Sequence, residues 1–251
     1  MGVNIGSTAG YFYLDSWVLA CVLYQGTARF CSRYFNHSND PCGRQYDQMV
    51  QAARSVYANI AEGSSRHQTS NETEMRLVDV ARGSVNELAS DFMNVLVTMN
   101  RCAWKNDDKN AMAVRSIRLE RPEIGSDIVH DVTSHLITQV NKFQLWFDAA
   151  DMSISCNALL LICGRINAML TKQLSKRLEL FKQTGGFTEN MSQERLTTLK
   201  SLSQDNSAPK CPKCGAIMFK RMARKGVNAG KEFWSCSNFR STGCSGTRPL
   251  S

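Results

Sequence analysis

Proline and histidine are scarce in this chain. Five prolines occur in 251 residues, and because proline interrupts helices, long stretches are free to be helical. The four histidines, His37, His67, His130 and His135, are dispersed. His130 and His135 would lie about 140° apart on a helix, which is poor geometry for a shared metal. No glycine-rich phosphate loop or nucleophile elbow is present. These absences favour an α-rich protein without enzymatic activity.

The sequence also lacks long hydrophobic runs. The apolar stretch from Ser16 to Tyr24 is too short to span a bilayer, and the run from Ala158 to Cys163 is soon followed by Arg165. The first ten residues, MGVNIGSTAG, contain no positively charged segment of the kind that opens a signal peptide. We therefore expect a cytoplasmic protein with no membrane contact.

Apolar residues recur at three- and four-residue steps in four long segments, which predicts four helices. They cover about 11–35, about 44–62, a third that ends near Asn100, and about 152–182. We expect Gly63 to end the second helix, Thr69 with Glu72 to form a capping box before the third, and Gly185–Gly186 to end the last. The basic strip Arg115–Arg121 is interpreted as a solvated helix face, with a second nucleic-acid contact as the alternative. The fold class predicted is an all-α antiparallel four-helix bundle over residues 11–186.

Acidic residues are almost missing from the end of the chain. Residues 210–251 contain nine basic residues and one acid, Glu232, so this segment carries +8, the net charge of the whole chain. The preceding residues are neutral overall. A neutral body with a basic tail indicates a nucleic-acid partner.

Four cysteines lie in the same basic segment: Cys211, Cys214, Cys236 and Cys244. Two thiolates on one tight turn and two more across a loop can form the closed tetrahedral shell that structural Zn²⁺ prefers. We therefore expect a small zinc-ribbon-like module over 210–251 with one Zn²⁺ per chain, joined by a polar linker over 187–209. The alternatives are free thiols or a redox pair at Cys211 and Cys214. The other six cysteines are interpreted as reduced.

Basic and aromatic side chains are interleaved between the cysteines. Cations can follow phosphates while exposed rings stack on bases. The contacts predicted are Lys213, Lys220, Arg221, Arg224, Lys225, Lys231, Trp234, Phe239 and Arg240. A small module also needs aromatics for its own core, so Trp234 and Phe239 have both interpretations, and we expect Phe233 to be buried.

Two stretches of the body carry a recognisable pattern, GRQYDQMVQAARSVYANIAEGSSR and VDVARGSVNELASD. The matching residues are Gln48, Arg54, Ser55, Asn59, Ile60, Ala61, Glu62, Gly63, Arg66, Ala81, Gly83, Ser84, Glu87 and Leu88. The pattern resembles the bacterial four-helix-bundle proteins encoded in intervening sequences of 23S ribosomal RNA genes, a group that includes the accessory variability determinant of diversity-generating retroelements.

That resemblance covers about residues 12–102 and, more weakly, 152–186. It implies a ring-like homopentamer with a surface that binds nucleic acid, and no enzymatic activity. Residues 103–150 then look like an insertion. Arg54, Asn59, Glu62, Gly63, Arg66 and Glu87 form the signature; they serve either an oligomer or nucleic-acid surface or, as we favour, structure. On the structural interpretation, Glu62 and Arg66 fix the turn after the second helix, and Asn59 or Glu87 satisfies buried polar groups.

The tail has a pattern of its own. Besides the cysteines, it matches at Lys213, Gly215, Met218, Gly230, Phe233, Trp234, Ser237 and Asn238. This pattern resembles the C-terminal zinc module of bacterial type IA topoisomerases, which helps to bind single-stranded DNA. Together the two patterns are similar to "four helix bundle suffix" proteins, bundles with an appended zinc module.

The sequence therefore predicts a non-enzymatic, oligomeric bundle whose zinc modules bind single-stranded or structured DNA or RNA. An alternative is a protein-interaction scaffold, in which the zinc module docks an acidic protein such as a polymerase or reverse transcriptase.

Overall fold

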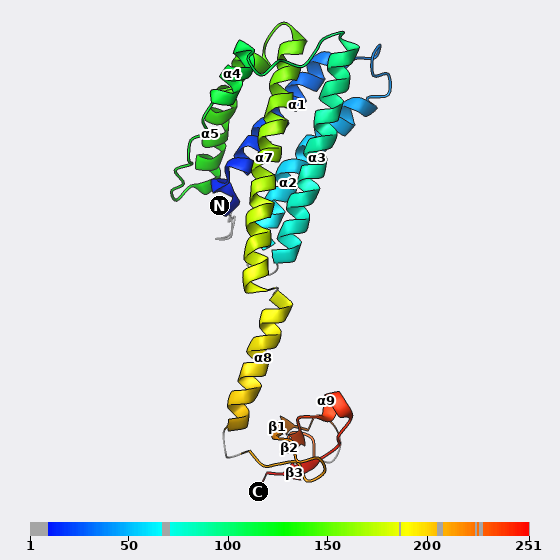
Figure 1. Ribbon diagram of the computed structural model, residues 1–251, viewed down its shortest axis with the longest axis vertical. Coiled ribbons are helices and arrows are strands. Elements are labelled where there is room, and N and C mark those ends of the chain that lie inside the picture. Colours follow the sequence, from blue (N-terminus) through cyan, green and yellow to red (C-terminus); the bar gives the residue numbers. More distant parts are fainter. Residues whose placement is uncertain are drawn as a thin grey trace. The chain divides into compact units, whose positions relative to one another are not determined.

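The structure is a computed structural model that describes residues 10–66, 71–185, 187–204, 208–223, 225 and 228–250. The chain divides into two compact units, residues 1–187 and 188–251. The first unit is helical, and the second holds a long helix followed by a small sheet with one short helix (Figure 1). The expectation of a mostly helical protein is confirmed.

Four long helices form the centre of the first unit. They are α1 (Asp15–Tyr34), α2 (Arg44–Arg66), α3 (Asn71–Thr98) and α7 (Met152–Thr184). α2 packs against α1 and α3, and α7 packs against the same two helices. A 3-10 turn, η1 (Gly10–Tyr13), precedes α1 and contacts α2.

One hydrophobic core is shared by the four helices. Phe30 of α1, Met49 of α2, Phe92 of α3 and Leu159 of α7 are all fully buried. The rings of Phe30 and Phe92 meet edge to face, with centroids 5.6 Å apart. The apolar stripes read from the sequence are therefore the faces that pack together.

Residues between α3 and α7 form an arm of three short helices, α4 (Lys109–Ser116), α5 (Ile128–Asn141) and α6 (Gln144–Phe147). α5 packs against α1, and α4 and α6 pack against α7. The predicted helix face over Arg115–Arg121 is wrong beyond Ser116, because α4 ends there and the backbone becomes extended at Ile117. Arg115 instead binds Asn106 through both terminal nitrogens, and Arg121 lies over the Tyr13 ring.

Two arginines fasten this arm to the core helices. Arg33 of α1 donates to the carbonyl oxygens of Phe147 and Ala149, at 2.7 and 2.6 Å. Arg165 of α7 donates to the carbonyl oxygen of Ile117 at 2.9 Å and to that of Val114 at 3.1 Å. Each guanidinium thus satisfies two carbonyls at the end of a helix, where intrahelical partners run out.

The sequence predicted that Gly63 ends the second helix. This prediction is wrong, because α2 continues to Arg66. A Cβ atom at this position would lie 3.3 Å from the Cβ atom of Leu77 and 3.4 Å from the carbonyl oxygen of Glu74. The glycine therefore allows α2 and α3 to approach closely. Thr69 of the expected capping box lies outside the described residues.

Within the described part of the chain, α7 is long and apolar enough to span a membrane by length and composition alone. Half of its most apolar window, however, is buried inside the protein. Leu159, Ile162 and Ile166 all lie in the core, and the Arg165 side chain donates hydrogen bonds to backbone carbonyls of the arm. The hydropathy of α7 is therefore accounted for by its central position in the first unit.

Apart from its first residue, α8 (Phe187–Gln204) belongs to the second unit, and it makes most of the predicted linker helical. The module that follows contains a three-stranded antiparallel sheet in the order β1 (Met218–Met222), β2 (Glu232–Cys236) and β3 (Thr247–Pro249). A short helix, α9 (Phe239–Thr242), connects β2 to β3. Among the described residues of the module, the buried hydrophobic ones are Cys211, Met218 and Cys236. So small a core cannot stabilise a module of this size alone.

Replacing Gly26 by alanine should destabilise the first unit. A Cβ atom there would lie 2.6 Å from Cζ of Phe147 and 2.7 Å from Cδ2 of Leu159, and both side chains are fully buried. Overpacking of this kind costs about 1–3 kcal/mol, more than the roughly 1 kcal/mol gained in helix propensity. The G164A variant is the control, since a Cβ at Gly164 meets nothing within 4 Å. We expect G26A to lower and G164A to raise the urea midpoint of the helical signal; a stabilised G26A would contradict the packing of α1 against α6 and α7.

Candidate metal centre and its basic surroundings

The first cysteine pair lies on a tight turn before β1. The Gly215 backbone N–H donates to the carbonyl oxygen of Cys211 at 2.9 Å, and Gly215 adopts a positive φ of 73°. This turn folds the chain so that the Lys213 N–H reaches the Cys211 sulfur, at 3.4 Å. The residues between the two cysteines therefore orient the first sulfur.

The second pair flanks α9. Cys236 ends β2, and its sulfur accepts from the Asn238 N–H at 3.4 Å, as Cys211 does from Lys213. Cys244 follows Gly243, which ends α9 in the left-handed region. Gly246 lies against the cluster, because a Cβ atom on it would overlap the Cys211 sulfur. Only glycine therefore fits at position 246 without displacing a candidate ligand.

The four sulfurs converge, as the spacing predicted. All lie within 4.8 Å of one another, with Cys211 and Cys244 3.8 Å apart and Cys214 and Cys236 3.3 Å apart. A tetrahedral zinc with sulfur ligands at about 2.3 Å requires sulfur–sulfur distances of about 3.8 Å. The residues present thus fit a metal ion of this type, and Cys211, Cys214, Cys236 and Cys244 would hold it.

The surroundings of the sulfurs differ in their effect on protonation. Desolvation opposes ionisation of Cys211, but hydrogen bonds from the Lys213 and Cys214 N–H groups outweigh it and lower its pKa to about 7. Desolvation, assisted by the neighbouring sulfurs, raises the pKa of Cys236 to about 12. Because thiolates are the ligands, metal binding at this cluster would release protons.

No other group of three or more His, Cys, Asp or Glu side chains within the described ranges converges closely enough to hold a metal. His130 and His135 line one open depression with Glu120, Glu123 and Asp131. Cys31, Cys156 and Cys163 are buried in the core, where burial raises the pKa of each thiol, whereas Cys42 and Cys102 are exposed. The metal-ligating chemistry of the described chain is therefore concentrated in the module.

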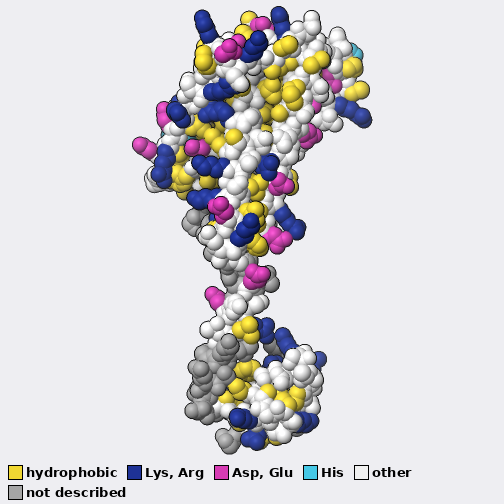
Figure 2. Space-filling view, in the orientation of Figure 1, with side chains coloured by type: hydrophobic (Ala, Val, Ile, Leu, Met, Phe, Trp, Pro, Cys, Tyr) yellow, Lys and Arg dark blue, Asp and Glu magenta, His cyan; other side chains and the backbone are white. Residues whose placement is uncertain are grey.

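Cationic side chains surround the cysteine cluster. Every basic residue of the module that the structure describes is exposed: Lys210, Lys213, Lys220, Arg221, Lys225, Lys231, Arg240 and Arg248. Arg224 lies outside the described residues. Among those described, none forms an ion pair; Lys213 Nζ donates to the Ser245 hydroxyl at 2.8 Å. On the face drawn in Figure 2, Lys and Arg side chains are visible on the module, whereas the first unit shows side chains of both charges.

The sheet places one aromatic ring between two of these cations. Trp234 pairs with Lys220 of β1 and with Arg248 of β3, and cross-strand partners share a face of an antiparallel sheet. Lys220 Nζ lies 5.6 Å from the centre of the Trp234 ring, which is half-buried against the module core. Phe233 is also half-buried, not buried as expected. Phe239 is 53% exposed and is the freer of the two predicted stacking rings.

Arg248 was not among the contacts predicted from the sequence. The run Thr247–Pro249 is too short and too close to proline to read as a strand. Only its register with β2 places Arg248 opposite Trp234. The sequence shows that Arg248 is basic, but it does not predict that Trp234 lies opposite it.

The signature residues of the body are distributed along α2 and α3. Arg54 and Glu62 are exposed, and the side chain of Arg66 lies outside the description. Asn59, which was expected to satisfy buried polar groups, donates from its Nδ2 to the Ser55 carbonyl oxygen of its own helix at 2.8 Å. Glu87 is exposed and lines a shallow polar groove between α2 and α3 with Gln48, Ser55 and Ser84. It therefore does not satisfy a buried group.

Comparison with known proteins bears on the first unit. No curated protein and no solved structure matches the chain. The similarity of the module to topoisomerase zinc modules stays a prediction. Residues 14–109, which run from just before α1 to the first residue of α4, match the family described as 23S rRNA-intervening sequence protein.

Proposed function

We propose that this protein is a non-enzymatic nucleic-acid-binding protein whose C-terminal module is folded by one Zn²⁺. The observation that carries this proposal is the set of exposed cations around the four-cysteine cluster, which have no acidic partner among the described residues. Four thiolates and one Zn²⁺ together carry −2, so the +8 of residues 210–251 becomes +6. That charge remains available for phosphates.

Single-stranded nucleic acid is the ligand class that suits this surface best. The cations are spread over strands and turns, and the described residues of the module include no helix long enough to enter a major groove. Phe239 is exposed beside Arg240, so a base can stack where a phosphate is also bound. Binding through phosphates and ring faces gives little sequence preference.

The helical unit is proposed to be an antiparallel four-helix bundle that assembles as a homopentamer. The mutual packing of α1, α2, α3 and α7 and the family match over residues 14–109 support this proposal. Several modules on one assembly would bind a single strand together, so that a weak contact in each gains from the high effective concentration of the others. Light scattering of the intact chain tests the assembly.

A salt titration tests nucleic-acid binding. With a fluorescent single-stranded oligonucleotide, log K should fall with log salt by roughly 0.7 for each phosphate contacted. The K220Q/R221Q variant should bind roughly tenfold more weakly at low salt and show a slope smaller by about 1.4.

The control is K172Q/K176Q, which removes two exposed cations from α7 and should leave both quantities unchanged. If the zinc-loaded protein shows no binding at low salt, the proposal fails. The alternative, a module that docks an acidic protein such as a polymerase or reverse transcriptase, would then be favoured.

A further inference from the structure

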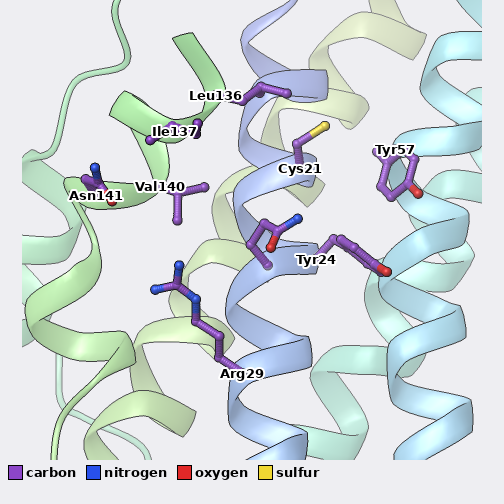
Figure 3. Close-up of a pocket in the computed structure, with 9 residues that line it drawn as sticks. Cys21, Tyr24, Arg29, Tyr57, Leu136, Ile137, Val140 and Asn141 are labelled. Carbon is purple, nitrogen blue, oxygen red and sulfur yellow. The ribbon is translucent and has the colours of Figure 1, made fainter. Parts of the chain in front are cut away.

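A pocket of about 320 Å³ lies between α1, α2 and α5 in the first unit. α1 contributes Cys21, Tyr24, Gln25 and Arg29, α2 contributes Tyr57, and α5 contributes Leu136, Ile137, Val140 and Asn141 (Figure 3). One side thus comes from helices within the family match, and the other comes from the arm outside it. Its volume is within the range of small-molecule sites.

The walls of the pocket are apolar and aromatic. Leu136, Ile137 and Val140 form one wall, and the Tyr24 and Tyr57 rings form another, meeting edge to face with centroids 5.4 Å apart. Figure 3 shows Val140 and Ile137 on the α5 side, opposite the two tyrosines. A flat or branched apolar group can therefore be enclosed between a helix face and a rigid aromatic corner.

The polar groups of the pocket have unused hydrogen-bonding capacity. Within the described chain, the hydroxyls of Tyr24 and Tyr57 and the side-chain amides of Gln25 and Asn141 form no hydrogen bond. The Arg29 guanidinium lies 3.8 Å from Asp148, too far for a hydrogen bond, and both side chains are about half exposed. An ion pair of that kind contributes little, so the five N–H donors of Arg29 remain available.

The charge of the lining is positive. None of the nine lining residues is acidic, and Arg29 is the cation among them. Burial raises the pKa of Cys21 to about 12, and desolvation raises the pKa of Tyr57, so both groups are neutral at pH 7. Two charged residues lie next to the lining. Asp148 faces Arg29, and the positive charge of Arg54 favours ionisation of Tyr57, although desolvation has the larger effect on its pKa. An acid group entering the pocket meets a cation and several neutral donors.

We propose that this pocket binds a small organic anion, with a single acid group on Arg29 and an apolar body between the tyrosines and α5. The ligand would bridge the arm to α1 and α2, so binding would also hold α5 in place. This site is separate from the zinc module, and its existence does not depend on nucleic-acid binding.

Two dyes that differ by one acid group test this assignment. 8-Anilinonaphthalene-1-sulfonate carries a sulfonate, and N-phenyl-1-naphthylamine has the same ring body without it. Fluorescence titration of the full-length zinc-loaded protein should show one saturable site per chain for the sulfonate. In the R29Q variant its affinity should fall roughly tenfold, the loss expected for a charge-assisted hydrogen bond, while the neutral dye should be unaffected.

Separate experiments test where the dye binds and whether it is held only by non-specific attraction to positive charge. The R101Q variant removes an exposed arginine elsewhere on the same unit and should bind both dyes as the parent does. Hydrogen exchange should show that the sulfonate protects amides of Ile128–Asn141, and that R29Q loses this protection. The proposal is overturned if R29Q leaves sulfonate affinity unchanged, if it weakens both dyes equally, or if protection falls on the zinc module instead.

Discussion

Replacing Cys211 and Cys214 together by serine is expected to abolish zinc binding and unfold the module, while the first unit stays helical. The wild-type chain should contain one Zn²⁺. Structural zinc in small domains contributes roughly 10–16 kcal/mol of apparent binding free energy. The module buries too few hydrophobic residues to replace that contribution. Elemental analysis gives the stoichiometry, and limited proteolysis reports whether residues 210–250 have become accessible.

The matched control is C42S/C102S, which removes two exposed cysteines outside the cluster and should retain metal and protease resistance. G246A provides an independent test that keeps all four sulfurs. Because its Cβ would overlap the Cys211 sulfur and displace it, this variant should also weaken metal binding. A metal-free chain with a protease-resistant module would refute a metal-dependent fold.

Replacing Arg177 by methionine is expected to destabilise the first unit by about 3 kcal/mol. Its Nε lies 2.9 Å from Glu74 Oε1 and joins α7 to α3. The Glu74 side chain is 1% exposed, and its second oxygen has no hydrogen-bond partner among the described residues. Removing one member of a buried pair leaves the other charge uncompensated, which typically costs about 3–5 kcal/mol. Arg177 is 29% exposed, so the lower figure applies.

The double variant E74M/R177M distinguishes an unpaired charge from lost packing. Two apolar side chains at these positions leave nothing charged to desolvate, and such replacements are often neutral or stabilising. We therefore expect urea unfolding to show that the double variant recovers most of the stability lost in R177M. If the double variant were as unstable as R177M, the contribution of Arg177 would have to come from packing of its aliphatic stem.

The parts of the structure that depend on local pattern were readable from the sequence. Apolar residues at helical spacing marked α1, α2, α3 and α7, and the spacing of four cysteines marked the metal cluster. The errors arose where a local signal competed with a distant contact. Gly63 resembles a helix terminator, yet it serves the approach of Leu77 from α3. The pairing of Trp234 with Arg248 depends on strand register, which no local signal in Thr247–Pro249 encodes.

The arm was the least predictable region for a related reason. Its helices are short, and the bonds that position it join residues far apart in sequence. Arg33 and Phe147 are 114 positions apart, and Arg165 and Ile117 are 48 apart. Neither arginine has a sequence neighbour that indicates such a role, and the pocket between α1, α2 and α5 exists only because the arm is held there.

The groups that accept hydrogen bonds from Arg33 and Arg165 affect how freely the sequence of the arm can change. All four are backbone carbonyl oxygens, at Val114, Ile117, Phe147 and Ala149. Every amino acid supplies that group, so the attachment places no chemical demand on the side chains at its receiving end. Half-buried positions such as 117 and 149 can therefore change in sequence while the arm keeps its attachment, and the side chains that these hydrogen bonds require are those of the two donors. Mutational tolerance and rigid attachment, usually in conflict, are compatible here.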